Sequence, residues 1–168
     1  MAVPSLITTP GAANANSYCS IAEADDYFDT HLYGGTWSDA DNETQARALL
    51  IATRLLDEHM NWNGFKFTAL QSLRFPQSGL VDRDGFVVDH LTIPKALINA
   101  TAEFAKCLID EDRTAEPDTK GFSRMRAGDL ELYIDKIDQK KVIPDSVISL
   151  ISFLGTPKSF KSNKLTRC

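Results

Sequence analysis

The sequence predicts a mainly α fold: a small helical bundle with a long turn-rich connector, a short β-hairpin and extended arms at both ends. Apolar residues follow the i, i+3, i+4 period of a buried helix face on both sides of residues 62–94. The two sets are Leu49, Ala52, Leu55, Leu56 and Met60, and Leu97, Ala100, Phe104, Cys107 and Leu108. Turn dipeptides and prolines fill the stretch between them, at Asn63-Gly64, Pro76, Asp84-Gly85 and Pro94.

Length and composition bound the domain organisation. With 168 residues, 43% of them hydrophobic and 24% charged, the chain has enough apolar material for one globular core. We expect an N-terminal arm (1–17), a single helical domain (18–155) and a basic C-terminal tail (156–168). No signal-peptide pattern and no apolar run of membrane-spanning length is present, which predicts a soluble protein without a membrane partner.

The first half of the domain is predicted to contain two helices. Residues 5–9 of the arm are consistent with an edge strand. Ser20 and Glu23 form a capping-box pattern, which predicts a helix over 21–32 that ends at Gly34-Gly35. Acidic residues at 38–41 open a second helix that runs to about residue 61, and the two helices should pack as a hairpin.

The connector is predicted to carry short extended pieces around a turn. Residues 73–75 and 86–88 flank the Asp-Arg-Asp-Gly sequence at 82–85. That sequence resembles the start of a calcium loop, but the later ligand positions are not supplied, so we interpret it as a solvated turn. Phe75 stands among apolar neighbours before Pro76, and we expect its side chain to be buried.

The remaining elements are a helix, a loop, a hairpin and a last helix. Pro94 opens a helix that runs to Asp110, with Thr92 as its cap. Residues 111–128 have no period and predict a mobile loop. Alternating apolar residues over 129–137 predict a strand that pairs with residues 120–126. The last helix is expected from Pro144-Asp145 to Gly155.

The search for catalytic and metal-binding residues gives no site. His31, His59 and His90 lack metal-ligand spacing, and the acids Asp25, Asp26 and Asp29 are typical of a solvated helix start. Cys19, Cys107 and Cys168 are odd in number and far apart, which predicts reduced thiols in an intracellular protein, with Cys107 in the core. No phosphate-binding glycine loop or activated nucleophile is present. The sequence therefore predicts a non-enzyme without a cofactor or metal.

Several segments, in a fixed order over residues 16–112, carry a family resemblance. They are Asn-Ser-Tyr-Cys-Ser at 16–20, Ala-Thr-Arg-Leu-Leu-Asp at 52–57, Trp-Asn-Gly at 62–64, Leu-Arg-Phe-Pro-Gln-Ser-Gly at 73–79, Asp-Arg-Asp-Gly at 82–85 and Ile-Pro at 93–94. This order resembles a family of small tailed-bacteriophage virion proteins, the head-to-tail connector or adaptor proteins. The same family is often labelled as DnaT-like single-stranded-DNA-binding proteins.

The resemblance implies a structural virion protein at the head-tail junction. Such a subunit forms a homo-oligomeric ring, commonly twelve-fold, below the portal, and its partners are the portal protein and the tail or nozzle proteins. Double-stranded DNA passes through the channel only as cargo, and a net charge of −5 suits a wall that does not hold phosphates. The tail residues predicted to dock on the portal are Lys158, Phe160, Lys161, Lys164, Leu165 and Arg167.

A single-stranded-DNA-binding module is the alternative function. Such a module needs basic residues interleaved with exposed aromatic rings. The candidates are Lys66 between Phe65 and Phe67, and Arg74 beside Phe75. Given the acidic balance, we expect binding to single strands no tighter than about micromolar at physiological salt. A small hydrolase is a third class, and it lacks a nucleophile.

Overall fold

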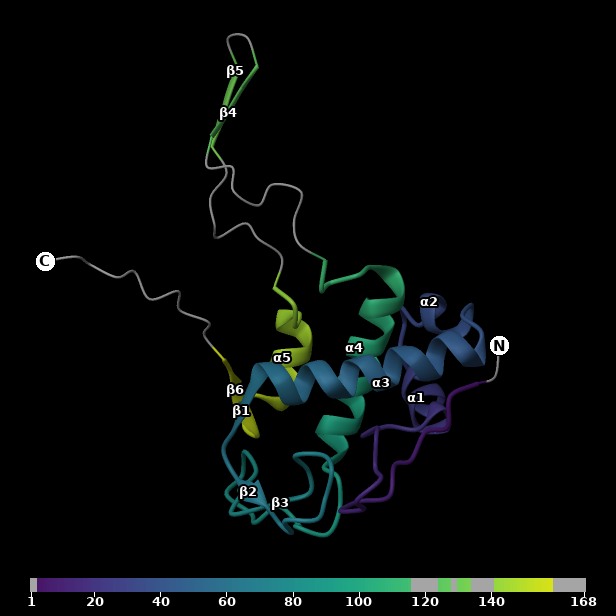
Figure 1. Cartoon of the computed structure of the whole chain (residues 1–168), viewed down its shortest axis with the longest axis vertical. Helices are drawn as coiled ribbons and strands as arrows, with labels where there is room; N and C mark the ends of the chain where they lie inside the picture. Colours follow the sequence, from purple (N-terminus) through teal and green to yellow (C-terminus); the bar gives the residue numbers. More distant parts are fainter. Residues whose placement is uncertain (1–2, 116–123, 128–129, 134–140, 159–168) are drawn as a thin grey trace, which may run out of the picture.

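Two long helices form the centre of the fold. The structure, a computed structural model, describes residues 3–115, 124–127, 130–133 and 141–158. Helix α3 (Asn42–His59) crosses α4 (Lys95–Asp110), and α4 contacts all the other helices of the described part (Figure 1). These are α1 (Ile21–Phe28), α2 (Gly35–Ser38) and α5 (Asp145–Ile151). The fold is thus a small, mostly helical domain, as predicted.

The predicted apolar faces of the two long helices are the core. The α3 face is buried at every predicted position, and on the α4 face Leu97, Ala100 and Phe104 are fully buried. Cys107 and Leu108 are only half-buried and pack against the edge of the core. None of the helices in the described ranges is both long and apolar enough to span a bilayer.

The first helix begins as predicted and ends early. The Ser20 hydroxyl accepts from the Glu23 N–H at 3.3 Å, and Glu23 Oε2 accepts from the Ser20 N–H at 2.8 Å. The predicted end at Gly34-Gly35 is wrong, because α1 stops at Phe28, and Gly34 caps α2 while Gly35 is its first residue. Phe28 stacks on Trp37 with centroids 5.5 Å apart, which folds the chain back, and a Cβ on Gly34 would lie 3.2 Å from the Phe28 carbonyl oxygen. Although α1 touches α3, the main partner of α3 is α4 rather than α1.

The predicted second helix corresponds to α3, which is shorter than predicted at both ends. It begins after Asp41, whose carboxylate accepts from the Thr44 N–H at 2.7 Å. At the other end, β1 (Met60–Trp62) pairs antiparallel with β6 (Gly155–Pro157). A Cβ on Gly155 would lie 2.5 Å from the Asn61 carbonyl oxygen, so this glycine permits close strand approach and does not end a helix. The last helix therefore stops at Ile151, and the first residues of the predicted tail belong to β6.

Side-chain hydrogen bonds replace two predicted local structures. Residues 5–9 form no strand, because Asn16 satisfies the backbone there: its Oδ1 accepts from the Ile7 N–H at 2.7 Å and its Nδ2 donates to the Ser5 carbonyl at 2.9 Å. Thr92 is not the cap of α4. Pro94 occupies that position without a side-chain bond.

The connector carries small strands at other places than predicted. β2 (Phe65–Lys66) pairs with β3 (Gln77–Ser78), whereas residues 73–75 are not a strand. The 82–85 turn is confirmed, with Val81 bridged to Val87 and Gly85 at φ 86°. β4 (Arg124–Ala127) and β5 (Leu130–Tyr133) form the predicted hairpin. Residues 116–123, 128–129 and 134–137 of the predicted loop and strand lie outside the described residues.

Phe75 supplies a test of this architecture. Its side chain is 1% exposed, and its ring meets Tyr18 and Trp62 edge-on with centroids 6.0 and 4.9 Å away. We expect Phe75→Ala to lower the free energy of unfolding by about 3 kcal/mol or more, because it leaves a cavity among packed rings. Urea unfolding measures this loss.

Tyr33→Ala is the matched control, because the Tyr33 side chain is 72% exposed. Its truncation should change stability by less than about 0.5 kcal/mol. If the two variants unfold alike, Phe75 does not hold the connector to the helices.

Candidate nucleic-acid interface

The structure brings three of the sequence-predicted residues, Phe65, Lys66 and Arg74, to the lining of one hollow and buries Phe75. Phe75 is buried and offers no ring to a base. The Lys66 ammonium donates to the carbonyls of Gln71 and Ser72 at 2.9 and 3.3 Å, so it closes a loop. Phe65, which is 68% exposed, and the exposed Arg74 remain available.

The ring of Phe67 also has a contact within the protein. It packs against the His90 ring at a centroid distance of 4.7 Å. Lys66 and Phe67 thus each have a partner inside the connector, although the Phe67 side chain is 44% exposed and Lys66 lines the smaller of the two hollows described next.

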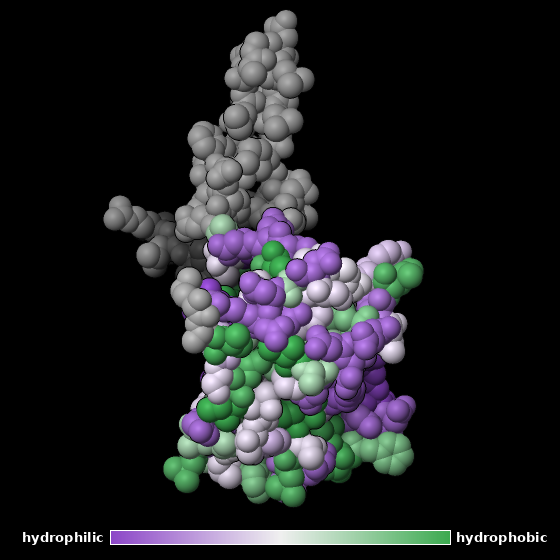
Figure 2. Space-filling view, turned by 90° about the vertical axis from the view of Figure 1, so that its right-hand side faces the viewer, coloured by the Kyte–Doolittle hydropathy of each residue, from purple (hydrophilic) through white to green (hydrophobic). Residues whose placement is uncertain are grey.

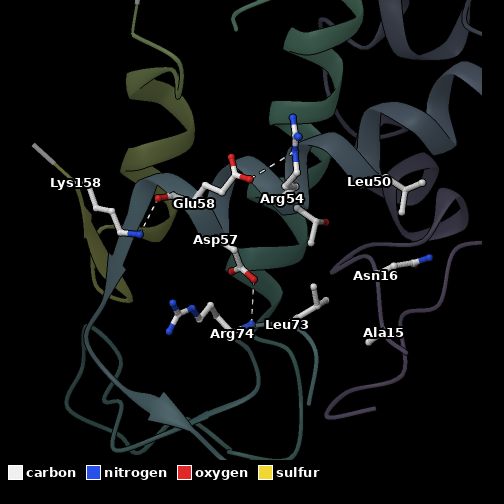
Figure 3. A pocket seen from close by; sticks show the side chains of 10 residues that line it. Ala15, Asn16, Leu50, Arg54, Asp57, Glu58, Leu73, Arg74 and Lys158 are labelled. Carbon is white, nitrogen blue, oxygen red and sulfur yellow. Dashed lines mark hydrogen bonds and ion pairs between the residues drawn. The ribbon is translucent and has the colours of Figure 1, made fainter. Parts of the chain in front are cut away.

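Arg74 lies where two hollows meet beneath α3. One, of about 650 Å³, lies between α3, the N-terminal arm and the connector, and the other, of about 310 Å³, is lined by residues of β1, β2 and β3. Both are lined by Arg74 and Lys158, and we call the two adjoining hollows together the α3 groove; Figure 3 shows the larger one. The groove residues used below are Arg54, Asp57, Glu58, Trp62, Phe65, Lys66, Arg74 and Lys158.

Four cations line the groove, namely Arg54, Lys66, Arg74 and Lys158, and they come from three separate segments. Arg54 comes from α3, Lys66 and Arg74 from the connector, and Lys158 directly follows β6. Lys158 is fixed by two hydrogen bonds of 2.7 Å, from its N–H to the His59 carbonyl and from its Nζ to the Glu58 carbonyl. Arg54 faces the Glu58 carboxylate at 3.9 Å with both side chains more than half exposed, a geometry that contributes little stability.

Asp57 fixes the backbone of Arg74. Its Oδ1 accepts from the Tyr18 hydroxyl at 2.6 Å and its Oδ2 accepts from the Arg74 N–H at 3.0 Å (Figure 3). The Tyr18 oxygen in turn accepts from the N–H groups of Arg74 and Phe75, at 3.1 and 3.2 Å. These bonds hold the connector against α3 and leave the Arg74 guanidinium in the groove.

The same cluster has shifted pKa values. Burial raises the pKa of Asp57, and the hydrogen bonds from Tyr18 and Arg74 together with the Arg74 charge offset part of that rise. Burial and the neighbouring Asp57 carboxylate raise the pKa of Tyr18, so Tyr18 remains a neutral donor. Asp57 therefore acts as a structural acceptor in the groove wall.

Two aromatic side chains, Trp62 and Phe65, line the part of the groove that is formed by β1, β2 and β3. Trp62 is half-buried and packs edge-on against Phe75, while the Phe65 ring lies beside Gly79. A Cβ at Gly79, which has φ 80°, would lie 3.0 Å from the Phe65 ring. The absence of that Cβ lets the ring rest on the backbone just after β3 while most of the ring stays exposed.

Sequence reasoning missed Arg54 and Trp62 as groove residues, since nothing local to either one indicates that they approach Arg74. Lys158 was predicted as a tail residue, and it is fixed in the groove. Phe160, Lys161, Lys164, Leu165 and Arg167 lie outside the described residues.

The other candidate residues are dispersed. His31, His59 and His90 lie on separate elements, and the described residues hold no cluster of three or more His, Cys, Asp or Glu able to bind a metal. Asp25 accepts from the Trp37 indole N–H at 2.8 Å. Cys19 and Cys107 are free thiols whose pKa values are raised by burial, and Cys168 lies outside the described residues.

Comparison with known proteins identifies the family of this chain. A family model described as "Putative DnaT-like ssDNA binding protein" matches residues 6–168. The chain belongs to this family. No curated protein and no solved structure matches the chain significantly.

The family description corrects the predicted function. It names binding of single-stranded DNA and neither a portal nor a tail. The interpretation as a head-to-tail adaptor is therefore wrong, together with its portal and tail partners, its twelve-fold ring and its duplex cargo. That interpretation depended on the order of short motifs, and the same resemblance also carried the single-stranded-DNA-binding label, so the motifs did not decide between the two functions.

The raised pKa of Asp57 predicts a pH-dependent stability. The folded chain binds this proton more tightly than the unfolded chain, whose aspartate pKa is about 3.9. The resulting stability is fully present below that unfolded value and is lost as pH rises through the folded value. Asp57→Asn removes this titration.

We expect the stability advantage of the parent over Asp57→Asn to shrink as pH rises from the acid range toward neutrality. Urea unfolding of both chains at a series of pH values measures the difference. An advantage that grows with pH would mean that the carboxylate is stabilised by its hydrogen bonds more than it is penalised by burial.

Proposed function

We propose that the protein is a single-stranded-DNA-binding module, without catalytic activity, and that the strand binds in the α3 groove. The observation that carries this proposal is the meeting of Arg54, Arg74 and Lys158 in one groove that ends at the exposed ring of Phe65. The family to which the chain belongs supports it.

Each groove residue has a distinct part in binding. The three cations bind the phosphates, which supply most of the affinity for a strand of any sequence. A base next to the bound phosphates stacks on Phe65, and such stacking contributes about 1–3 kcal/mol per base. Bases in a duplex are stacked on each other and paired, so the Phe65 ring favours a single strand.

The acidic residues limit the affinity. Glu58 stands beside Arg54 in the groove, and the chain as a whole carries a net charge of −5. Both weaken the attraction between the groove and a polyanion. We therefore place the dissociation constant for a short single strand at about micromolar at physiological salt.

The test is fluorescence anisotropy with a labelled oligothymidylate of about 15 nucleotides over a range of salt concentrations. Arg74→Ala and Lys158→Ala should each weaken binding and reduce the slope of log K against log salt by about 0.7. Phe65→Ala should weaken binding by about five-fold or more at every salt concentration and leave the slope unchanged.

Lys95→Ala is the matched control. Lys95 is an exposed cation at the start of α4 and does not line either hollow of the groove. Its removal gives the same change in net charge and should leave affinity nearly unchanged. Equal effects of Lys95→Ala and Arg74→Ala, or none from any variant, would refute the groove as the binding site.

A further inference from the structure

A second surface, separate from the cations of the α3 groove, lies on the 80–88 hairpin. The side chains of Val81, Phe86 and Val87 are 53%, 72% and 79% exposed, and that of nearby Leu91 is 59% exposed. We call these four residues the hairpin patch. Figure 2 shows hydrophobic residues at the lower end of the molecule, where Figure 1 places the connector. Grouped apolar side chains at a surface mark a site of interaction more often than single ones do.

The hairpin holds the patch in a defined shape. Its backbone is closed by hydrogen bonds from the Val88 N–H to the Leu80 carbonyl at 3.0 Å and from the Asp82 N–H to the Phe86 carbonyl at 2.8 Å. The Asp82 carboxylate accepts from the N–H groups of Asp84 and Phe86 at 2.9 and 2.8 Å. The apolar side chains therefore project from an ordered turn.

The charges around the patch are mainly negative. Asp82, Asp84 and Asp89 belong to the same loop, and Arg83 is its cation. Arg83 is turned toward α5, where it donates to the Ser149 carbonyl at 2.7 Å and lies over the Phe153 ring at 5.4 Å. An apolar surface with an acidic rim fits a segment that combines apolar and basic side chains.

The chain contains a segment of that chemistry. Residues 159–168 read Ser-Phe-Lys-Ser-Asn-Lys-Leu-Thr-Arg-Cys, with two large apolar residues, three cations and no acid. We propose that this C-terminal segment docks on the hairpin patch of the same chain. Phe160 and Leu165 supply the apolar contacts, and Lys161, Lys164 and Arg167 face the acidic rim.

The end of the described chain lies within reach of the patch. The contact of Arg83 with Phe153 brings the turn of the hairpin next to the residues that lead into β6. From Phe153 to Lys158 the chain advances about 17 Å at a strand rise of 3.3 Å per residue. The ten residues beyond Lys158 can span about 33–36 Å, which is enough to return. Tethering raises the effective concentration of the segment, so weak contacts suffice.

The experiment uses the full chain with a nitroxide spin label on Cys168. Cys107→Ser removes the other accessible thiol, and Cys19 is fully buried. Paramagnetic broadening of backbone amide resonances then reports where the labelled end lies. We expect the strongest broadening at residues 80–88, decreasing as salt is added.

Two pairs of variants make the result specific. Asp84→Lys and Phe86→Ser, which alter the acidic rim and the apolar patch, should each reduce the broadening at least several-fold. Asp26→Lys and Leu32→Ser are the matched controls on exposed positions of another part of the chain, and they should leave it unchanged.

Three results would overturn the proposal. The first is the absence of broadening at the hairpin, and the second is broadening centred on the resonances of Arg54 and Arg74 instead. The third is broadening of the resonances of unlabelled chains mixed with labelled ones, which would show docking between copies. The DNA titration of Phe86→Ser is a separate measurement. Unchanged DNA affinity in that variant shows that this contact and the α3 groove act independently.

Discussion

The hydrogen bonds between Tyr18, Asp57 and the backbone of the connector tie three distant parts of the chain together. Tyr18 precedes α1, Asp57 is in the last part of α3, and residues 74–75 follow the first loop of the connector. The Tyr18 N–H also donates to the Thr53 hydroxyl at 3.2 Å, which gives the same residue a second bond to α3. The connector is also held by the hydrogen bonds of Ser72 to the Ala12 carbonyl and of Arg83 to the Ser149 carbonyl.

The cluster also explains how one short sequence serves both the core and the groove. Arg74 and Phe75 are neighbours in the chain, yet the Arg74 side chain is exposed and the Phe75 side chain is buried. With their N–H groups fixed by Asp57 and Tyr18, Phe75 enters the core between aromatic rings and Arg74 enters the groove. The Asp57 carboxylate lies in the wall of the proposed phosphate-binding groove because its hydrogen bond to the Arg74 N–H positions Arg74 there. Burial raises the pKa of Asp57, and its two hydrogen bonds occupy both oxygens.

The sequence predicted those structural features that depend on the spacing of residues close together in the chain. The period of Leu49, Leu56, Leu97 and Phe104 predicted both long helices, and Ser20 with Glu23 predicted the start of α1, because each signal lies within a few residues. The pairing of β1 with β6 joins residues more than ninety positions apart, and no local pattern encodes it. For the same reason Arg54 and Lys158 were not recognised as neighbours of Arg74. Lys66 had the right local pattern and lines the groove, where the Gln71 and Ser72 carbonyls bind its ammonium.

The net charge was the least informative observation for function. A value of −5 averages 23 acidic and 18 basic residues over the whole surface, whereas salt screens exposed charges beyond about 8 Å under physiological conditions. A phosphate in the α3 groove therefore interacts with the few groups within that distance, among them Arg54, Arg74 and Lys158. The acidic total suggested a surface that does not hold DNA, but the fold gathers cations from three segments into one groove. In an acidic protein, the local arrangement of cations decides whether a strand can bind.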